Sequence, residues 1–165
     1  MTWQLYDHHG QRKYLNQKER AAFLVAAAGH QKPKVRTLCG VMFWTGCRVS
    51  EALALTADRV DVAEQVIVFE SLKKRRSGHY RAVPVPDTLL ADLRQIHMLD
   101  GLWARADGGR GVRLWPLDRT TAWRQIGTVM KKAGIATGPW ATPRGLRHGF
   151  GVSAISAGVP LNLVQ

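Results

Sequence analysis

Apolar residues in the first third of the chain recur every three to four positions, which is the spacing of one helix face. A glycine ends the first of these runs and a proline opens the second, and both residues favour those positions in helices. The pattern predicts three successive helices, over about 16–29, 33–46 and 49–55. Residues 1–15 lack this period, and we expect them to form a loosely packed N-terminal arm.

A different pattern follows the third helix. Residues 66–69 and 80–85 are short runs of β-forming residues, and the loop between them contains a glycine and many Lys and Arg residues. Two such runs joined in this way are typical of an antiparallel hairpin. The sequence therefore adds a small antiparallel sheet to the helices.

Helical spacing returns after the hairpin. Asp87 and Asp118 each precede an apolar run, and aspartate is a favoured N-cap residue. Residues 100–116 contain four glycines and no period, which indicates a loop. A last helix is expected from Pro143 towards Ala157, and the apolar segment after it indicates the start of another. We therefore predict an α+β fold that is predominantly α-helical with a small antiparallel β-sheet.

Charge narrows the range of functions. The 165 residues include 24 Lys and Arg against 12 Asp and Glu, which gives a net charge of +12. Such a charge on a compact chain indicates a polyanionic partner. The apolar runs are shorter than the roughly 18–20 residues of a membrane span, and the polar N-terminus does not fit a secretory signal.

The cysteines exclude two further classes of protein. Cys39 and Cys47 lie in an apolar stretch without the spacing of zinc ligands or of a disulfide framework. We expect reduced thiols, a cytoplasmic protein, and no metal or other cofactor.

The break between the second and third predicted helices reads TGCRVSEAL and contains the first basic candidate, Arg48. An Arg at such a break projects from a sharp turn, where backbone N–H groups can also face an anion. Glu51, three residues further on, could fix the direction of the guanidinium group. A plain surface ion pair between these two residues is the alternative for this segment alone.

The second basic segment is the loop of the predicted hairpin, with four consecutive cations, Lys73, Lys74, Arg75 and Arg76. Arg81 follows on the next strand. These charges could receive phosphates of a duplex backbone, each contact releasing a counterion. A solvated turn explains the segment equally well.

The third basic segment, TPRGLRHGF, contains three residues at positions i, i+3 and i+4 of a helix, which places them on one face. They are Arg144, Arg147 and His148. Cations this close repel one another unless an anion lies among them. The opposite side is expected to contribute to the core through Leu146, Phe150, Val152 and Ile155.

In this order and spacing, the three segments resemble the catalytic domain of the tyrosine recombinases, the phage integrase family. The family segment TGxRxSEaLxL, which carries the first catalytic Arg, is matched by TGCRVSEALAL and Arg48. A family lysine on the hairpin, ahead of an RxVPxP strand, acts as general acid. The strand here is RAVPVP, and the lysine is Lys73 or, one residue later, Lys74.

The second family box reads HxLRH, and this chain has RGLRH. Arg147 matches the second catalytic Arg and His148 matches the trailing His. Arg144 replaces the first His of the box, and a guanidinium group stays charged, so at that position it could bind a phosphate oxygen but not transfer a proton.

The resemblance implies that a Tyr hydroxyl attacks a DNA phosphodiester and forms a 3′-phosphotyrosyl link without metal. The family tyrosine lies further beyond the second Arg than the 18 residues that follow Arg147 here, and the three tyrosines of this chain precede Arg147. We therefore expect a catalytic domain over 16–165 that is incomplete at its C-terminus and inactive as it stands.

Double-stranded DNA is the partner that the resemblance implies, with a bacterial or phage-derived protein in the cytoplasm, associated with the nucleoid. It also implies a tetramer on DNA for the full-length enzyme and leaves a monomer open for this chain. A non-cleaving DNA-binding relative is the main alternative. A basic RNA-binding domain fits less well, because it would expose aromatic residues for stacking, and most Trp and Phe residues here fall on predicted core positions.

Overall fold

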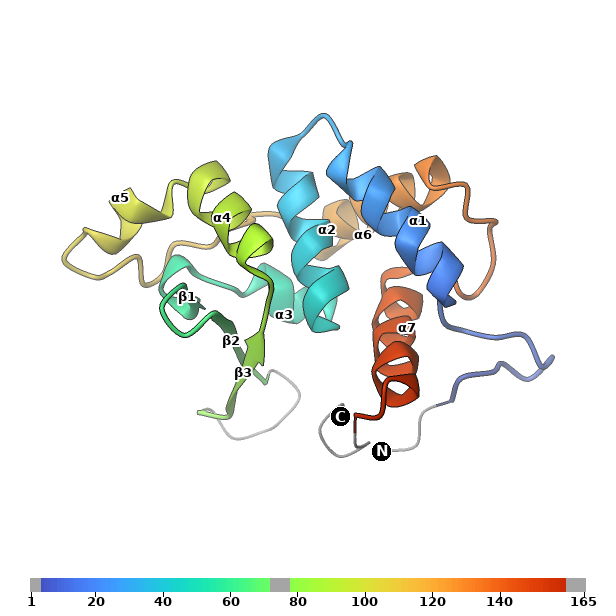
Figure 1. Ribbon diagram of the computed structural model, residues 1–165. Coiled ribbons are helices and arrows are strands. Elements are labelled where there is room, and N and C mark those ends of the chain that lie inside the picture. The colour runs from blue at the N-terminus through green and yellow to red at the C-terminus, as the bar shows by residue number, and fades with distance from the viewer. Residues whose placement is uncertain (1–3, 72–77, 160–165) are drawn as a thin grey trace.

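The computed structural model describes residues 4–71 and 78–159 of the chain (Figure 1). Within these residues, helices make up most of the regular structure, and a small sheet lies at one end of the molecule. The α-helices are α1 (Gln17–Ala28), α2 (Pro33–Thr45), α3 (Val49–Leu53), α4 (Asp87–Ile96), α5 (Leu99–Trp103), α6 (Arg119–Lys132) and α7 (Pro143–Ser156). The strands are β1 (Val60–Asp61), β2 (Val66–Glu70) and β3 (Tyr80–Pro84), and a short 3₁₀ helix, η1 (Ala57–Arg59), precedes β1.

The sheet is antiparallel in the order β1-β2-β3. Its β2 and β3 strands form the hairpin that the two runs of β-forming residues predict, with Phe69 opposite Arg81 and Ile67 opposite Val83. Ile67 and Phe69 are buried on the core side, as the period of two along a strand requires. The two-residue strand β1 was not predicted, because a strand this short shows no alternation of apolar and polar residues in the sequence.

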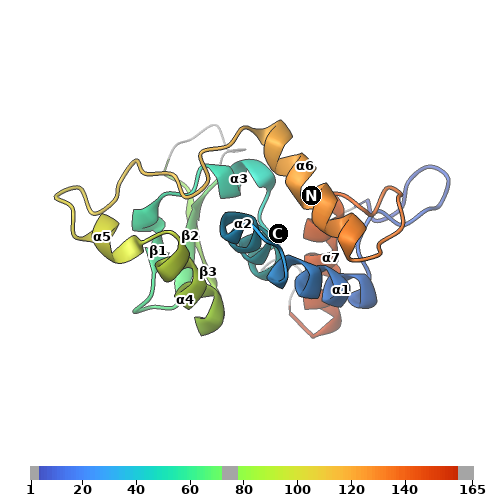
Figure 2. The ribbon, with the colours of Figure 1, turned by 90° about the horizontal axis from the view of Figure 1, so that it is seen from above.

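Helix α2 lies at the centre of the molecule. It packs against α1, α4 and α7, and its inward residues Leu38, Val41 and Met42 are almost completely buried. The sheet lies on one side of α2, and α1 and α7 lie on the other (Figure 1). Figure 2 shows the same division from above, with α6 running along the side next to α3. Among the described residues, no helix is long and apolar enough to cross a membrane.

Two glycines determine how closely α7 packs. A Cβ atom at Gly145 would lie 1.8 Å from the Trp140 carbonyl oxygen, and one at Gly149 would lie 2.6 Å from the Leu15 carbonyl oxygen. The Leu15 N–H donates a hydrogen bond of 3.0 Å to the Gly145 oxygen. Leu15, at the end of the N-terminal arm, is therefore buried against the helix that carries Arg147.

Several local expectations were wrong. The stretch 100–116, expected to be a loop, contributes most of α5. Asp87 is the first residue of α4 and not its N-cap, which is Pro86; Asp118 does cap α6, accepting the Thr121 N–H at 2.7 Å. Ile155, expected in the core, is 43% exposed. The helix expected to start at Pro160 lies outside the described residues.

A buried polar network joins three distant parts of the core. His97 Nε2 lies 2.8 Å from the Thr37 hydroxyl oxygen, and the indole N–H of Trp115 donates to the Lys34 carbonyl oxygen at 2.9 Å. Burial and the nearby Lys34 lower the pKa of His97 to about 4, against an opposing hydrogen bond with the Leu114 backbone. The imidazole is therefore neutral in the folded protein at pH 7.

This network predicts acid sensitivity. Between pH 6.5 and 4 the unfolded chain binds a proton at His97 that the folded protein does not, so stability falls as pH falls. The expected loss of unfolding free energy from His97 is roughly 3 kcal/mol by pH 4. Denaturant unfolding at several pH values measures it, and His97→Gln should flatten the profile over this window. An equally steep profile in that variant would assign the acid sensitivity to other groups.

Candidate active site

The turn between α2 and α3 brings the two candidate catalytic arginines together. Gly46 ends α2 with a left-handed φ of 65°, and a Cβ atom there would lie 2.3 Å from the Phe150 ring of α7. The Gly46 carbonyl oxygen accepts a hydrogen bond of 3.0 Å from Arg147 Nε–H. Arg147 is thus fixed to the backbone two residues before Arg48, although the two arginines are far apart in the sequence.

A buried carboxylate lies beside this pair. The side chain of Glu51 is 1% exposed. Its Oε1 accepts the backbone N–H of Arg48 at 2.8 Å, which also closes the first turn of α3. The guanidinium of Arg48 approaches less closely, with Nη1 at 3.8 Å from Oε2. The ion pair considered from the sequence is present, but it is not the tightest contact of Glu51.

The tightest contact comes from the sheet. Arg81 on β3 donates from Nη1 to Glu51 Oε2 at 2.7 Å and from Nη2 to Oε1 at 3.1 Å. Its guanidinium carbon lies 5.0 Å from the centre of the Phe69 ring on β2. Sequence reasoning grouped Arg81 with DNA-binding residues. In the structure its guanidinium binds a carboxylate, a pairing that the spacing of 30 residues could not indicate.

Three guanidinium groups and one carboxylate create a site with excess positive charge. Burial lowers the pKa of Arg147, and the charge of Arg48 lowers it further. Burial raises the pKa of Glu51, but hydrogen bonds from Arg81 and the Arg48 backbone outweigh it, so the net shift is downward and the carboxylate is ionised at neutral pH. Three cations around a single carboxylate form a favourable site for an anion.

The other two residues of the third basic segment lie differently from Arg147. Arg144 is exposed, one turn earlier on α7. His148 is half-buried. Burial and the nearby Arg147 lower its pKa, while a hydrogen bond with the Lys13 backbone acts in the opposite direction. Its ring is therefore largely neutral at pH 7. Arg147 hydrogen-bonds to the turn before Arg48.

The loop cations Lys73, Lys74, Arg75 and Arg76 lie outside the described residues. Within the residues that the structure covers, no group of three or more His, Cys, Asp or Glu side chains could hold a metal ion. Burial raises the pKa of both Cys39 and Cys47 to about 12, so these thiols stay protonated.

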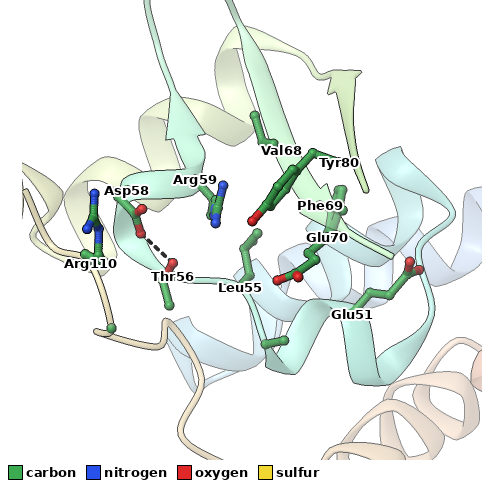
Figure 3. Close-up of a pocket in the computed structure, with 12 residues that line it drawn as sticks. Glu51, Leu55, Thr56, Asp58, Arg59, Val68, Phe69, Glu70, Tyr80 and Arg110 are labelled. Atoms are coloured by element: carbon green, nitrogen blue, oxygen red, sulfur yellow. Dashed lines mark hydrogen bonds between the residues drawn. The ribbon is translucent and has the colours of Figure 1, made fainter. Parts of the chain in front are cut away.

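A cavity of about 530 Å³ lies next to the site, between the β2–β3 hairpin and the η1 segment (Figure 3). Arg59 lies over the Tyr80 ring at 4.5 Å, and Thr56 hydrogen-bonds to Asp58 on another wall. Glu51 lines one end, and neither Arg48 nor Arg147 lines the cavity. No motif in the sequence indicated this feature, because its walls come from four separated segments.

Helix α6 presents a second basic surface. Its exposed residues include Arg119, Arg124, Lys131 and Lys132, and the helix contains no acidic residue. Trp123 is 38% exposed, with Arg119 at 6.0 Å from its ring. Helix α6 packs against both α3, which begins directly after Arg48, and α7, which carries Arg147. Cations at helical spacing without acidic partners were the sequence signal that could have identified this surface.

Comparisons with known proteins agree with this geometry. The phage integrase family model matches residues 13–165. The tyrosine recombinase XerD of Mycobacterium tuberculosis (strain ATCC 25618 / H37Rv) is 29% identical over 161 residues, covering 86% of this chain and 48% of the relative. XerA of Pyrococcus furiosus is 24% identical over 155 residues, with 90% and 50% covered. The chain thus spans about half the length of the curated relatives it matches.

Solved structures show the same fold. A crystal structure of XerA recombinase superimposes with a TM-score of 0.71 at 28% identity, covering 92% of this chain and 54% of that one. A pre-cleavage complex of XerH recombinase with its difH substrate gives 0.73 at 20% identity, covering 97% and 51%. With the family match over nearly the whole chain, these findings lead to one conclusion: the chain belongs to the phage integrase family, the tyrosine recombinases.

Proposed function

We propose that this chain is the DNA-binding catalytic part of a site-specific recombinase that cleaves and rejoins DNA through a 3′-phosphotyrosyl intermediate. The observation that carries the proposal is the placement of Arg48 and Arg147. The Arg147 Nε–H bond to Gly46 holds two cations at one turn, beside a single buried carboxylate. Such an arrangement favours a dianionic group, as a phosphodiester becomes during attack by a hydroxyl group.

The chemistry follows from the groups present. As the hydroxyl group loses its proton to solvent and its oxygen bonds to phosphorus, charge builds on the two non-bridging oxygens, and the bond to the 5′-oxygen breaks. Guanidinium forks of Arg48 and Arg147 neutralise that charge through paired hydrogen bonds. Lys73, or Lys74 in its place, protonates the leaving 5′-oxygen. We assign Arg144 a phosphate contact and His148 a hydrogen bond to the same group.

The nucleophile is assigned to a Tyr-bearing segment beyond Gln165. Support comes from the family resemblance and from the place of the chain's own tyrosines. Tyr6 and Tyr14 pack edge to face with ring centres 6.3 Å apart, and Tyr80 lines the cavity under Arg59. A non-cleaving relative would share the same cationic site and the same DNA partner. The two candidates therefore differ in cleavage and not in binding.

Duplex DNA is the partner we assign. Structural relatives have been solved with DNA, among them XerH with difH and the Tn1549 transposon integrase with transposon end DNA. The net charge of +12 and the exposed cations of α6 support the same partner here. We assign tetramer formation on DNA to the complete protein, acting in the cytoplasm on chromosomal or phage DNA.

Salt dependence tests the binding proposal. Affinity for a duplex oligonucleotide, measured by fluorescence anisotropy, should fall linearly on a log–log plot against salt, with a slope of about 0.9 per phosphate contact. Arg124→Ala should reduce that slope by about one contact if α6 faces the backbone. Arg94→Ala is the matched control, because Arg94 pairs with Asp100 on a separate surface. A flat salt titration, or a preference for single-stranded RNA, would contradict the proposal.

A further inference from the structure

Glu51 has more cationic neighbours than one carboxylate can neutralise. Arg48 and Arg81 both form ion pairs with it, and Arg147 is close enough for the charge of Glu51 to oppose part of the lowering of the Arg147 pKa by burial. A carboxylate has two oxygens, and a bidentate Arg fork occupies both. The partner that takes the fork position therefore decides which arginines remain available to a ligand.

The distances show which partner holds that position. Arg81 makes two hydrogen bonds to Glu51, at 2.7 and 3.1 Å, whereas the guanidinium of Arg48 stays 3.8 Å away. A charge-assisted hydrogen bond between these groups would measure about 2.7–2.9 Å. Arg48 thus contributes its backbone N–H to Glu51 and keeps its guanidinium out of hydrogen-bonding range.

The sheet fixes Arg81 in place. Arg81 stands opposite Phe69 in the β2–β3 register, and its guanidinium lies over the Phe69 ring at 5.0 Å. The Arg81 guanidinium therefore reaches Glu51 of α3 from strand β3, and the pairing of β2 with β3 fixes its orientation. Without it, the nearest cation to the buried carboxylate would be the side chain of Arg48, from the same helical turn.

We propose that Arg81 is a positioning residue: its fork holds the Glu51 carboxylate and so leaves the guanidinium of Arg48 available to a phosphate oxygen. Three guanidinium groups against one carboxylate give the site a net charge of +2, and Arg81 determines that this excess lies on Arg48 and Arg147. This proposal rests on the recombinase function proposed above, because that function makes a DNA phosphate the ligand of Arg48.

Removing the fork tests the proposal without DNA first. In ¹⁵N-labelled Arg81→Ala, the Nε–H resonance of Arg48, assigned by its loss in Arg48→Lys, should move as the guanidinium pairs with Glu51. Adding Glu51→Gln to Arg81→Ala should return the resonance to its original position, because the amide oxygen still accepts the Arg48 backbone N–H but carries no charge. Arg94→Ala, which removes an exposed Arg–Asp pair, should leave it unchanged.

Duplex binding supplies the second measurement. Arg81→Ala should bind a duplex oligonucleotide roughly tenfold more weakly, as expected for one lost charge-assisted contact. The double variant Glu51→Gln/Arg81→Ala should recover most of that loss. A purely structural role for Arg81 would predict no recovery, since the double variant also lacks the fork. Arg81→Lys keeps the charge but not the paired hydrogen bonds, and its duplex affinity should lie between those of the wild type and Arg81→Ala. This variant also provides a test if Arg81→Ala folds poorly.

The outcomes separate this inference from the proposed function. An unmoved Arg48 resonance with unchanged duplex binding in Arg81→Ala overturns the inference and leaves DNA binding intact. If the Arg48 resonance moves in Arg81→Ala but the wild-type chain binds no duplex, the proposed function is overturned. The inference that Arg81 keeps Arg48 from pairing with Glu51 is then still supported. Loss of duplex binding that Glu51→Gln does not recover makes Arg81 a DNA contact or a structural residue and contradicts the inference.

Discussion

Incubated with a nicked suicide duplex, which traps phosphotyrosyl intermediates, the 165-residue chain is expected to form no covalent adduct. Attack requires a Tyr hydroxyl in line with the phosphate held by Arg48 and Arg147. Tyr6 and Tyr14 pair with each other within the N-terminal arm, and Tyr80 lies against Arg59 in a cavity that neither Arg48 nor Arg147 lines. Labelled DNA on a denaturing gel measures the adduct directly.

Where the reading frame continues past Gln165, the protein extended by that segment is the control for this experiment. If that segment contains the nucleophile, the extended protein should give an adduct under the same conditions. A non-cleaving relative would bind the duplex and give none in either form. An adduct from the 165-residue chain would contradict the prediction, and peptide mapping would then identify the tyrosine responsible.

Local sequence signals explain most of the fold. Three signals each act within a few residues, so the elements they specify could be predicted: the proline at position 33, the cap at Asp118 and the run of β-forming residues over 66–69. Helix α5 was not predicted because it lacks such a local signal. Its five residues are too few to show a helical period, and the glycine-rich stretch around them favours a loop in any reading of the sequence.

The site was predictable only in part. Motif order indicated that Arg48 and Arg147 would be neighbours, and the Gly46 turn shows how: only a residue without Cβ allows α7 to approach it. The fork of Arg81 on Glu51 joins residues 30 positions apart through a strand pair, so no local pattern reports it. The burial of Arg20 on α1 could not be predicted from a local pattern either. This residue is 8% exposed and its guanidinium lies over the Phe43 ring of α2 at 4.3 Å.

In the extended protein, Arg147→Ala is expected to slow cleavage by about 10²–10³, the usual cost of removing one group that stabilises developing oxyanion charge. Arg48→Ala should have a similar effect. Each guanidinium acts mainly on the charge that appears during attack, so duplex affinity should change much less than the rate. Arg147 has the further task of binding the Gly46 oxygen, and its loss should also loosen α7 against the turn.

Single-turnover cleavage at saturating protein, with anisotropy for affinity, separates the two effects. Arg94→Ala, which removes an exposed ion pair from α4, should cleave and bind like wild type. Equal losses of rate and affinity in Arg48→Ala would mean that the residue holds DNA in the ground state instead of stabilising the transition state. Wild-type rates in both Arg48→Ala and Arg147→Ala would remove the two arginines from the chemistry, because the proposed mechanism relies on them to stabilise the charge that develops on the phosphate oxygens.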